Sequence, residues 1–483
     1  MEDNKIVANQ QLSIWEALLP ILALIGMLAY NVFVFGDDAL SGSNQFVLLL
    51  GAAIAFLVGI RNGVDYHEMM EEVSFNLKNT TPPILILLFV GSLAGTWLIS
   101  GIIPSMIYYG LKILNPTIFL PATVIICAII SIATGSSWTT SATVGIALVG
   151  IGKAVGLPLG MVAGAVISGA YFGDKMSPLS DTTNLAPAMA GTDLFTHIRY
   201  MSLTTVPTII ITLIVFTIIG LTRSTDGTTD TTEILAAIDG SFNISGWLFL
   251  VPAFVIFMIV RKTKPLIALM IGTLLGALFA ILFQPNIVTS ITGADGLTLR
   301  SAYMGVMTAM TVDVGIETSS AELNDLFTSS GMAGMLGTIW LIICAMVFGG
   351  VMDAIGALSR ISQTLLDMAK SAFGLFASTA ASCLALNVTA SDQYLAIVVP
   401  GKMFQKAYKD RGLAPENLSR TLEDSGTVTS VLIPWNTCGA YQSGVLNVSV
   451  EQYFAYAIFN YLSPLMTLFY AAFMIKIRQI GEE

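Results

Sequence analysis

The sequence predicts an all-α membrane protein that crosses the bilayer many times. Hydrophobic residues fill 55% of the 483 positions and charged residues only 11%, whereas about a quarter of an average soluble domain is charged. The mean hydropathy is +0.79. Apolar runs also recur along the chain at the length that a helix needs to cross a hydrocarbon core of about 30 Å. Together these observations predict a polytopic helical membrane protein.

Eight apolar runs fit simple spanning helices, which need roughly 17 to 25 residues. They cover residues 15–35, 45–60, 83–108, 195–221, 244–260, 265–284, 333–357 and 452–475. Two other stretches, 116–192 and 371–445, are apolar but contain many Gly, Pro, Ser, Thr and acidic residues. Irregular backbone at membrane depth is tolerated only inside protein or beside a wet cavity. We therefore expect each stretch to form a re-entrant hairpin followed by an interrupted helix.

Lys and Arg set the expected orientation, because cytoplasmic loops are enriched in both. The positions assigned to the cytoplasm are Arg61, Lys78, Arg199, Arg261–Lys264, Arg360, Lys370, Lys402, Lys406, Lys409, Arg411, Lys476 and Arg478. The acidic loops 36–44 and 224–240 then lie outside. This threading gives about ten crossings, five on each side of an extracellular linker at 223–243, with both termini cytoplasmic. An odd number of crossings per half places the two halves in opposite orientations in the membrane. We therefore predict two inverted repeats, residues 1–222 and 244–483.

Inverted repeats should leave weak internal similarity. Segments 134–152 and 173–191 of the first half resemble segments 386–401 and 426–444 of the second. At one common offset the matched pairs are Gly173 with Gly426, Ser177 with Ser430, Leu179 with Leu432 and Gly191 with Gly444. Many secondary transporters build a midplane site from paired broken helices of this kind.

The stretch "GAYFGDKMSPLSDTTNLA" (169–186) places acids, hydroxyls and an amide around Pro178. Polar groups inside a membrane are costly unless they line a wet cavity or bind something, and hard cations prefer oxygen ligands. The candidate ligands in this break are Asp174, Ser177, Asp181, Thr182 and Asn184. Asp174 and Asp181 could also carry protons. The alternative is structural: the hydroxyls bond to the backbone, and Asp174 pairs with Lys175 at a membrane boundary.

The second half repeats this chemistry in "TLEDSGTVTSVLIPWNTCG" (421–439). Its candidates are Glu423, Asp424, Thr427, Asn436 and Thr437. Two further segments, 135–145 and 386–394, are interpreted as hairpin tips, where free helix amides attract anions or hold hydroxyls toward a cation. The tip candidates are Ser137, Thr139, Thr140, Asn387, Thr389 and Asp392. Asp392 could instead be a helix cap facing water. Of all sixteen residues, Asp174, Asp181 and Asn436 are the preferred sodium ligands.

The remaining composition excludes several other functions. With 31 acidic against 21 basic residues, no basic stripe exists to bind nucleic acid. No P-loop, HExxH motif or nucleophile and base arrangement occurs, which disfavours nucleotide-driven transport and catalysis. No cofactor is expected. The cysteines at 127, 344, 383 and 438 are interpreted as small core residues, and His67 and His197 as surface residues of inside loops.

Three motifs, residues 163–186, "GSSWTTSATVG" (135–145) and "LSRTLEDSGTVTSVLIPWNTCGAYQSG" (418–444), resemble those of the NhaC-type sodium/proton antiporter family. The resemblance runs over nearly the whole chain. The family belongs to a wider ion transporter superfamily, whose dicarboxylate/sodium carriers are homodimers that work by an elevator motion. It implies that the tips at 136–140 and 387–392 and the breaks at 174–184 and 427–437 face one another around the cargo.

The tips differ from those of the dicarboxylate carriers, which have Ser-Asn-Thr at both positions. The bulky Trp138 and the additional Asp392 indicate a smaller, more cationic cargo. We therefore expect an antiporter that exchanges sodium for protons by alternating access in the inner membrane of a prokaryote, with a role in pH homeostasis. The alternative is a sodium- and proton-coupled exchanger of organic anions such as malate and lactate. That cargo would call for Arg or Lys beside the tips, where only Lys153 and Lys175 are near. A channel or a membrane enzyme is disfavoured.

Overall fold

The structure is a computed structural model that describes residues 12–35, 42–113, 116–222, 231–318, 324 and 327–481. The first half contains α1 (Ile14–Phe35), α2 (Ser43–Arg61), α3 (Tyr66–Asn79), α4 (Thr81–Ile99), α5 (Ile102–Ile113), η2 (Pro116–Ile118), α6 (Phe119–Thr134), α7 (Ser137–Thr140), the π-helix η3 (Ser141–Gly145), α8 (Ile146–Ala154), α9 (Leu159–Met176), α10 (Asp181–Ala190) and α11 (Leu194–Thr222). These helices confirm the predicted all-α class.

The second half is also helical except for one short antiparallel strand pair. It contains α12 (Thr231–Ser241), η4 (Gly246–Phe249), α13 (Leu250–Val260), α14 (Pro265–Phe283), α15 (Pro285–Thr292), α16 (Leu299–Thr311), β1 (Val314–Gly315), β2 (Thr328–Ser329), η5 (Ala333–Met335), α18 (Leu336–Ala354), α19 (Ala357–Met368), α20 (Ala372–Thr389), α21 (Gln393–Asp410), α22 (Pro415–Leu422), the π-helix η6 (Glu423–Thr427), η7 (Ser430–Leu432), α23 (Thr437–Leu446), α24 (Val450–Tyr453), η8 (Phe454–Tyr456) and α25 (Ile458–Ala472). In the strand pair, Val314 lies opposite Ser329.

Seven helices of the described residues are long and apolar enough to cross a membrane, or eight if the bent pair of α12 and α13 counts as one span. Two predicted spans are interrupted. The run 83–108 is divided between α4 and α5, because Gly101 adopts a left-handed conformation (φ 79°). The run 452–475 begins with the short turns α24 and η8 and becomes a regular helix only from Ile458.

The predicted linker at 223–243 is wrong in its described part, because residues 231–241 form helix α12. Ile234, Ala237, Ile238 and Phe242 are buried, and α12 packs against α5. The apolar residues of this segment are spaced three and four apart, which is the pattern of an amphipathic helix. The acidic residues between them led us to interpret the segment as a loop. The four cysteines are free and buried, as predicted.

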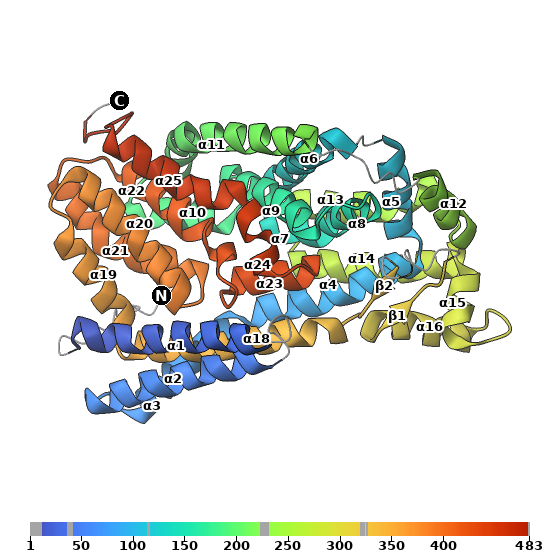
Figure 1. Ribbon diagram of the computed structural model, residues 1–483, viewed down its shortest axis with the longest axis horizontal. Helices are drawn as coiled ribbons and strands as arrows, with labels where there is room; N and C mark the ends of the chain where they lie inside the picture. Colours follow the sequence, from blue (N-terminus) through green and yellow to red (C-terminus); the bar gives the residue numbers. More distant parts are fainter. Residues whose placement is uncertain are drawn as a thin grey trace.

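Helices of the two halves pack across each other. Helix α4 packs against α14 and α16 of the second half, and α18 packs against α2 and α3 of the first. Figure 1 shows α1, α2 and α18 running side by side along one edge of the molecule, with α11 along the opposite edge. The hairpins and interrupted helices lie between these edges, where α9 packs closely on α6.

The same local geometry recurs in the two halves at a separation of 255 or 256 residues. Helices α4 and α18 have 19 residues each, and α5 and α19 have 12 each. Helices α10 and α23 have 10 each. Left-handed residues match as well, Gly135 with Ser391 and Gly156 with Gly412.

The hydrogen bonds that close the two breaks fix this register. Ser177 N donates to Asp174 O at 3.1 Å, and Ile433 N donates to Ser430 O at 3.3 Å, 256 residues later. The predicted alignment, which pairs Gly173 with Gly426 and Gly191 with Gly444, is therefore three residues out of register. It matched identical small residues, whereas the backbone hydrogen bonds define which positions are equivalent.

Candidate functional site

The first hairpin tip contacts the first break directly. Gly135 ends α6 in the left-handed conformation (φ 69°), and Ser136 caps α7 by accepting from Thr139 N at 3.1 Å. This turn places Ser137 next to Asp174 on α9. Ser137 N and Ser137 Oγ donate to Asp174 Oδ2 at 3.0 and 2.6 Å. A carboxylate held by a helix N-terminus and a hydroxyl is stabilised in its charged form.

The other hydroxyls of this tip stay within it. Thr139 Oγ1 donates to Ser136 Oγ at 3.0 Å, and Thr140 Oγ1 donates to Ser136 O at 2.9 Å. Both threonines are buried. They stabilise the turn in this conformation, and neither contacts Asp174 through a hydrogen bond of its side chain.

The first break spreads its polar side chains over four environments. Ser177 Oγ donates to Ile132 O on α6 at 2.8 Å. Asn184 Nδ2 donates to Pro178 O at 3.0 Å, which satisfies backbone exposed by the break. Thr182 Oγ1 donates to Glu423 Oε1 at 3.1 Å and so joins the two breaks. Asp181 is exposed at the first position of α10.

The second tip is tied to the second break by amides. Asn387 Nδ2 donates to Gly426 O at 2.7 Å and to Thr429 Oγ1 at 3.0 Å. Asn436 Nδ2 donates to Asn387 O at 3.0 Å, and Thr437 N donates to Ser391 O at 2.9 Å. These contacts place Asn387, Asn436 and Thr437 together.

Thr389 and Asp392 have local roles at this tip. Thr389 Oγ1 donates back to Ala385 O at 2.8 Å. Asp392 Oδ1 accepts from Tyr394 N at 2.8 Å and Leu395 N at 3.1 Å, which confirms the interpretation of Asp392 as a helix cap.

Glu423 lies in the π-helix η6 and is fully buried. Its Oε1 accepts from Thr182, whereas its Oε2 has no hydrogen-bond partner among the described residues. The Thr427 hydroxyl lies beside this carboxyl. π-helical turns occur often at functional sites, and a buried polar atom without a partner is rare in folded proteins.

Asp424 is in a different situation, because four side chains satisfy it. Lys175 on α9 and Thr467 on α25 both donate to its carboxylate. Thr204 Oγ1 on α11 donates to Oδ2 at 2.9 Å, and Ser463 Oγ donates to Oδ1 at 3.3 Å. Lys175 and Asp424 are both fully buried. The predicted alternative pairing of Asp174 with Lys175 is therefore wrong, since the ammonium group faces Asp424.

Two buried cationic or titratable side chains escaped the sequence analysis. Arg420 is fully buried, and none of its guanidinium nitrogens has a hydrogen-bond partner among the described residues. Its guanidinium carbon lies 4.6 Å from the ring centre of Tyr200. His197, expected on the surface, is fully buried, with Nδ1 2.8 Å from Ser419 Oγ. Arg420 could have been noticed in the sequence, because it lies within the motif 418–444 and one helical turn before Glu423.

Several buried polar atoms near the tips also lack partners among the described residues. They include Trp138 Nε1, Tyr171 OH and Ser391 Oγ. Trp138 and Tyr171 lie beside the Cys438 thiol, and Trp138 stacks on Tyr441 with ring centres 3.9 Å apart. Buried polar groups normally have protein or water partners.

Two hairpin tips and two interrupted helices that meet around buried carboxylates are the architecture of a secondary transporter. The sequence comparisons give the family. The profile of the Na+/H+ antiporter family matches residues 169–475, and relatives more than 30% identical match most of the chain. The chain belongs to the Na+/H+ antiporter family, which confirms the resemblance seen in its motifs.

Three curated relatives illustrate the range of names in this family. The Na(+)/H(+) antiporter NhaC of Alkalihalophilus pseudofirmus is 38% identical over 88% of this chain and 88% of its own. The Malate-2H(+)/Na(+)-lactate antiporter of Bacillus subtilis is 37% identical over 87% of this chain and 86% of its own. The Arginine/ornithine antiporter ArcD of Halobacterium salinarum is 33% identical over 94% and 91%. A solved structure of Neisseria gonorrhoeae MtrF, 13% identical over 94% of each chain, has a TM-score of 0.37, too low to inform the site.

Proposed function

We propose that this protein exchanges sodium ions for protons by alternating access at the meeting point of the two tips and the two breaks. The observation that carries the proposal is the charge of that meeting point. The first tip holds Asp174, Thr182 of the first break reaches Glu423 in the second half, and the neighbouring Lys175 is already paired with Asp424. A site with uncompensated carboxylates and neutral oxygens suits a small cation or a proton.

Within this site we assign sodium coordination first to Asp174, Asp181 and Asn436, with Ser137 and Thr182 as neighbouring oxygens. Glu423 is the preferred proton carrier, because one of its buried oxygens is uncommitted among the described residues. Asp424 has a different part. Its four donors make it a charge partner that holds α9, α11, η6 and α25 together.

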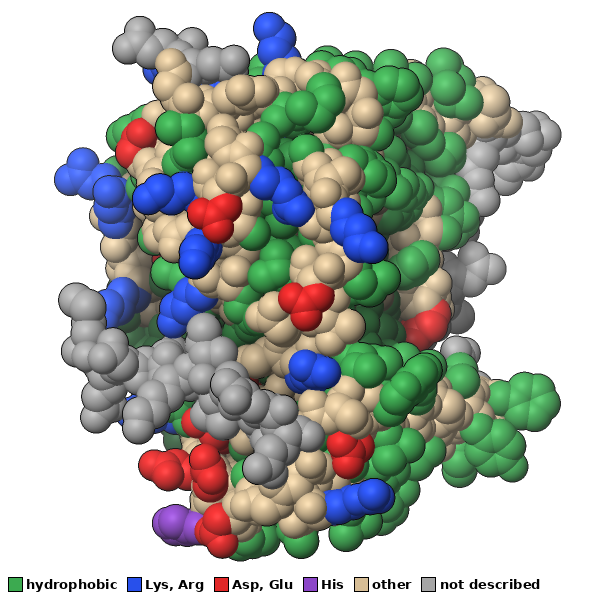
Figure 2. All heavy atoms as spheres, turned by 90° about the vertical axis from the view of Figure 1, so that its left-hand side faces the viewer, with side chains coloured by type: hydrophobic (Ala, Val, Ile, Leu, Met, Phe, Trp, Pro, Cys, Tyr) green, Lys and Arg blue, Asp and Glu red, His purple; other side chains and the backbone are tan. Residues whose placement is uncertain are grey.

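The transport mechanism we favour is an elevator motion in a homodimer embedded in a prokaryotic inner membrane. The recurring geometry of residues 1–222 and 244–483 supports two inverted repeats. Figure 2 shows Lys and Arg side chains gathered over the end of the molecule that lies at the left in Figure 1. By the positive-inside rule this end faces the cytoplasm, and we assign both termini to the same side.

An organic-anion exchanger is the second candidate, favoured by the 37% identical malate and lactate relative. A carboxylate cargo would need a cationic partner. Lys175 could supply one only by leaving Asp424, which would strand a buried charge at a large energetic cost. The sodium and proton function is therefore the better fit.

A transport assay separates these functions. The purified protein is reconstituted with a pH-sensitive dye inside the liposomes, and sodium, malate or lactate is added outside. We expect internal pH to change on adding sodium alone. If the internal pH changed only when malate or lactate was also present, the organic-anion exchanger would replace this proposal.

The same assay tests the assigned ligands. Asp174→Asn and Asp181→Asn should each abolish sodium-driven proton movement, because a neutral amide cannot balance the ion's charge. Asp367→Asn, an exposed acid that bonds Gln363 on α19, is the matched control and should leave transport unchanged. Wild-type transport by Asp181→Asn would remove that residue from the site.

A further inference from the structure

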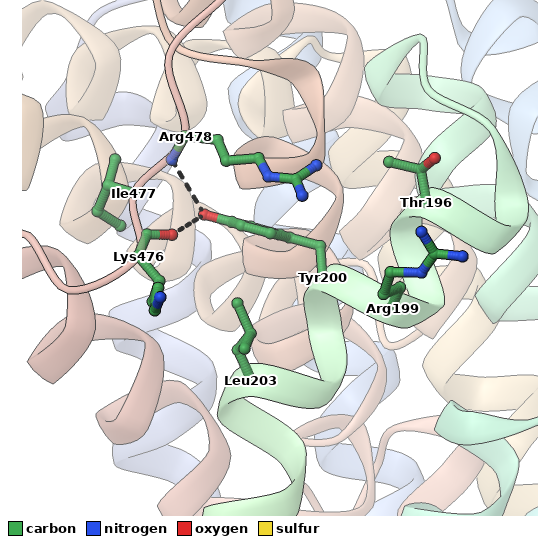
Figure 3. A pocket seen from close by; sticks show the side chains of 7 residues that line it. All are labelled: Thr196, Arg199, Tyr200, Leu203, Lys476, Ile477 and Arg478. Atoms are coloured by element: carbon green, nitrogen blue, oxygen red, sulfur yellow. Dashed lines mark hydrogen bonds between the residues drawn. The ribbon is translucent and has the colours of Figure 1, made fainter. Parts of the chain in front are cut away.

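A pocket of about 410 Å³ opens at the beginning of α11, away from the ion site. Thr196, Arg199, Tyr200 and Leu203 line it from α11, and residues 476–478 line it from the segment after α25. Figure 3 shows the Tyr200 ring between these two elements, with its hydroxyl directed at the backbone of Lys476 and Arg478. Ligand pockets commonly enclose about 300 to 1,000 Å³.

The pocket carries more positive charge than its surroundings neutralise. Arg478 Nη1 lies 3.1 Å from Glu416 Oε1 and is paired. Arg199 and Lys476 are exposed and make no ion pair among the described residues. The buried Arg420 adds its charge behind Tyr200, 4.6 Å from the ring centre. Three cationic side chains thus act on this pocket without an acidic partner of their own.

Exposed apolar side chains lie next to the lining residues in the sequence. Phe195 beside the pocket on α11 is 69% exposed, and Phe473 and Met474 ahead of Lys476 are 67% and 52% exposed. Exposed aromatic and apolar side chains next to basic ones are typical of the boundary between acyl chains and headgroups. A ligand that fits must therefore join an anionic group to an apolar part.

We propose that this pocket binds the phosphate group of an anionic phospholipid, with Arg199 and Lys476 contacting the phosphate and the acyl chains lying along Phe195 and Phe473. Basic pockets between membrane helices at the cytoplasmic face bind acidic headgroups, and guanidinium groups match phosphate geometry. Free inorganic phosphate shares the anionic chemistry but not the apolar part.

Bound lipid would hold together the elements that frame the ion site. Tyr200 OH donates to Asn417 Oδ1 on α22 at 2.5 Å, and Asn417 Nδ2 donates to Arg478 O at 2.8 Å. Ala414 N also donates to Arg478 O at 3.1 Å. Helix α22 continues directly into the π-helix that carries Glu423. The pocket therefore joins α11, α22 and the C-terminal segment.

Binding can be measured without any transport. The protein, purified in a neutral detergent and freed of lipid, is titrated with short-chain phosphatidylglycerol, short-chain phosphatidylcholine or inorganic phosphate, and occupancy is read by native mass spectrometry. We expect phosphatidylglycerol to bind at least about tenfold more tightly than phosphatidylcholine, because only the former has a net negative headgroup.

Variants locate the site. The double variant Arg199→Ala with Lys476→Ala should lose most phosphatidylglycerol binding, whereas Arg199→Lys with Lys476→Arg should keep it. The double variant Lys402→Ala with Lys406→Ala removes two exposed charges from α21 and is the control. Equal loss in this control, or equal affinity for phosphatidylcholine, would overturn the proposal. Saturation by inorganic phosphate that displaces the lipid would identify free phosphate as the ligand and overturn the lipid assignment.

Discussion

Carboxylates one residue apart in this protein have opposite environments. Glu423 and Asp424 are both fully buried, yet Glu423 has one uncommitted oxygen among the described residues while Asp424 accepts from Lys175, Thr204, Ser463 and Thr467. A charge that is already paired and hydrogen-bonded gains little from a transported cation. The geometry therefore separates a carboxylate suited to carrying protons from one suited to holding helices together.

The buried pair makes a stability prediction. Lys175→Met should lower the free energy of unfolding by about 3–5 kcal/mol, because it leaves Asp424 buried without its cation. Adding Asp424→Asn should recover a large part of that loss, since the buried charge is removed and the amide oxygen can still accept from Thr204 and Thr467. Thermal unfolding in detergent of the two single variants and the double variant measures the coupling. Strictly additive losses would mean that the two groups do not act as a pair.

Close helix packing fixes the distance between α6 and α9, together with the hydrogen bond that Ser131 Oγ on α6 donates to Ala170 O on α9 at 2.6 Å. A Cβ atom added at Gly169 would lie 2.2 Å from Val124 O, and one added at Gly173 would lie 2.4 Å from Ala128 O. Both glycines let the α9 backbone approach α6, as small residues do at membrane helix interfaces. Because α9 carries Asp174 and α6 leads to the first tip, this spacing also sets the Ser137 contact with Asp174.

Gly169→Ala should therefore destabilise the protein by about 1–3 kcal/mol through overpacking and should weaken sodium binding by displacing Asp174. Gly26→Ala is the matched control, because Gly26 lies within α1 with nothing within 4 Å of an added Cβ. Alanine there should be neutral or slightly stabilising. Melting temperatures and sodium affinity of both variants test this. Equal behaviour of the two would show that the α6 and α9 contact can relax.

The two halves of the chain build one site that neither half could build alone. Thr182 of the first half reaches Glu423 of the second, and Tyr441 of the second half donates to Trp138 O of the first at 3.2 Å. A cation or a proton at this meeting point interacts with acids from both halves. Exchange through a single site then requires the two cargoes to compete.

Competition predicts that the half-saturating sodium concentration rises steeply as pH falls, because protonated carboxylates exclude sodium. Apparent sodium affinity between pH 6 and pH 9 in reconstituted vesicles measures this directly. Glu423→Gln should flatten the dependence, since the amide cannot take up the proton. A sodium affinity independent of pH in the unaltered protein would contradict a shared site and favour separate paths.

Amino-acid sequence alone predicted the class of the molecule, which the helices and the family confirm. The four segments assigned to its site stay a prediction. Apolar length and interrupted motifs are local properties, so the irregular stretches 116–192 and 371–445 could be recognised from the sequence. Helix α20 of the second stretch is nevertheless long and apolar enough to cross a membrane, so the re-entrant hairpin there stays a prediction. The helix caps also follow from local chemistry, as Ser136 and Asp392 show. The recurrence of local geometry between the halves supports the predicted repeats, in a register three residues away from the predicted alignment.

Only the tertiary structure decided which polar residues contact one another. Lys175 could face Asp174 one residue away or Asp424 on another helix, and the helical rotation of α9 together with its packing on α25 selects Asp424. The same cause buries His197 and Arg420, and gives helix α12 an apolar face to pack on α5. Residue types record which groups are polar, whereas burial and partners depend on distant segments that meet only when the chain has folded.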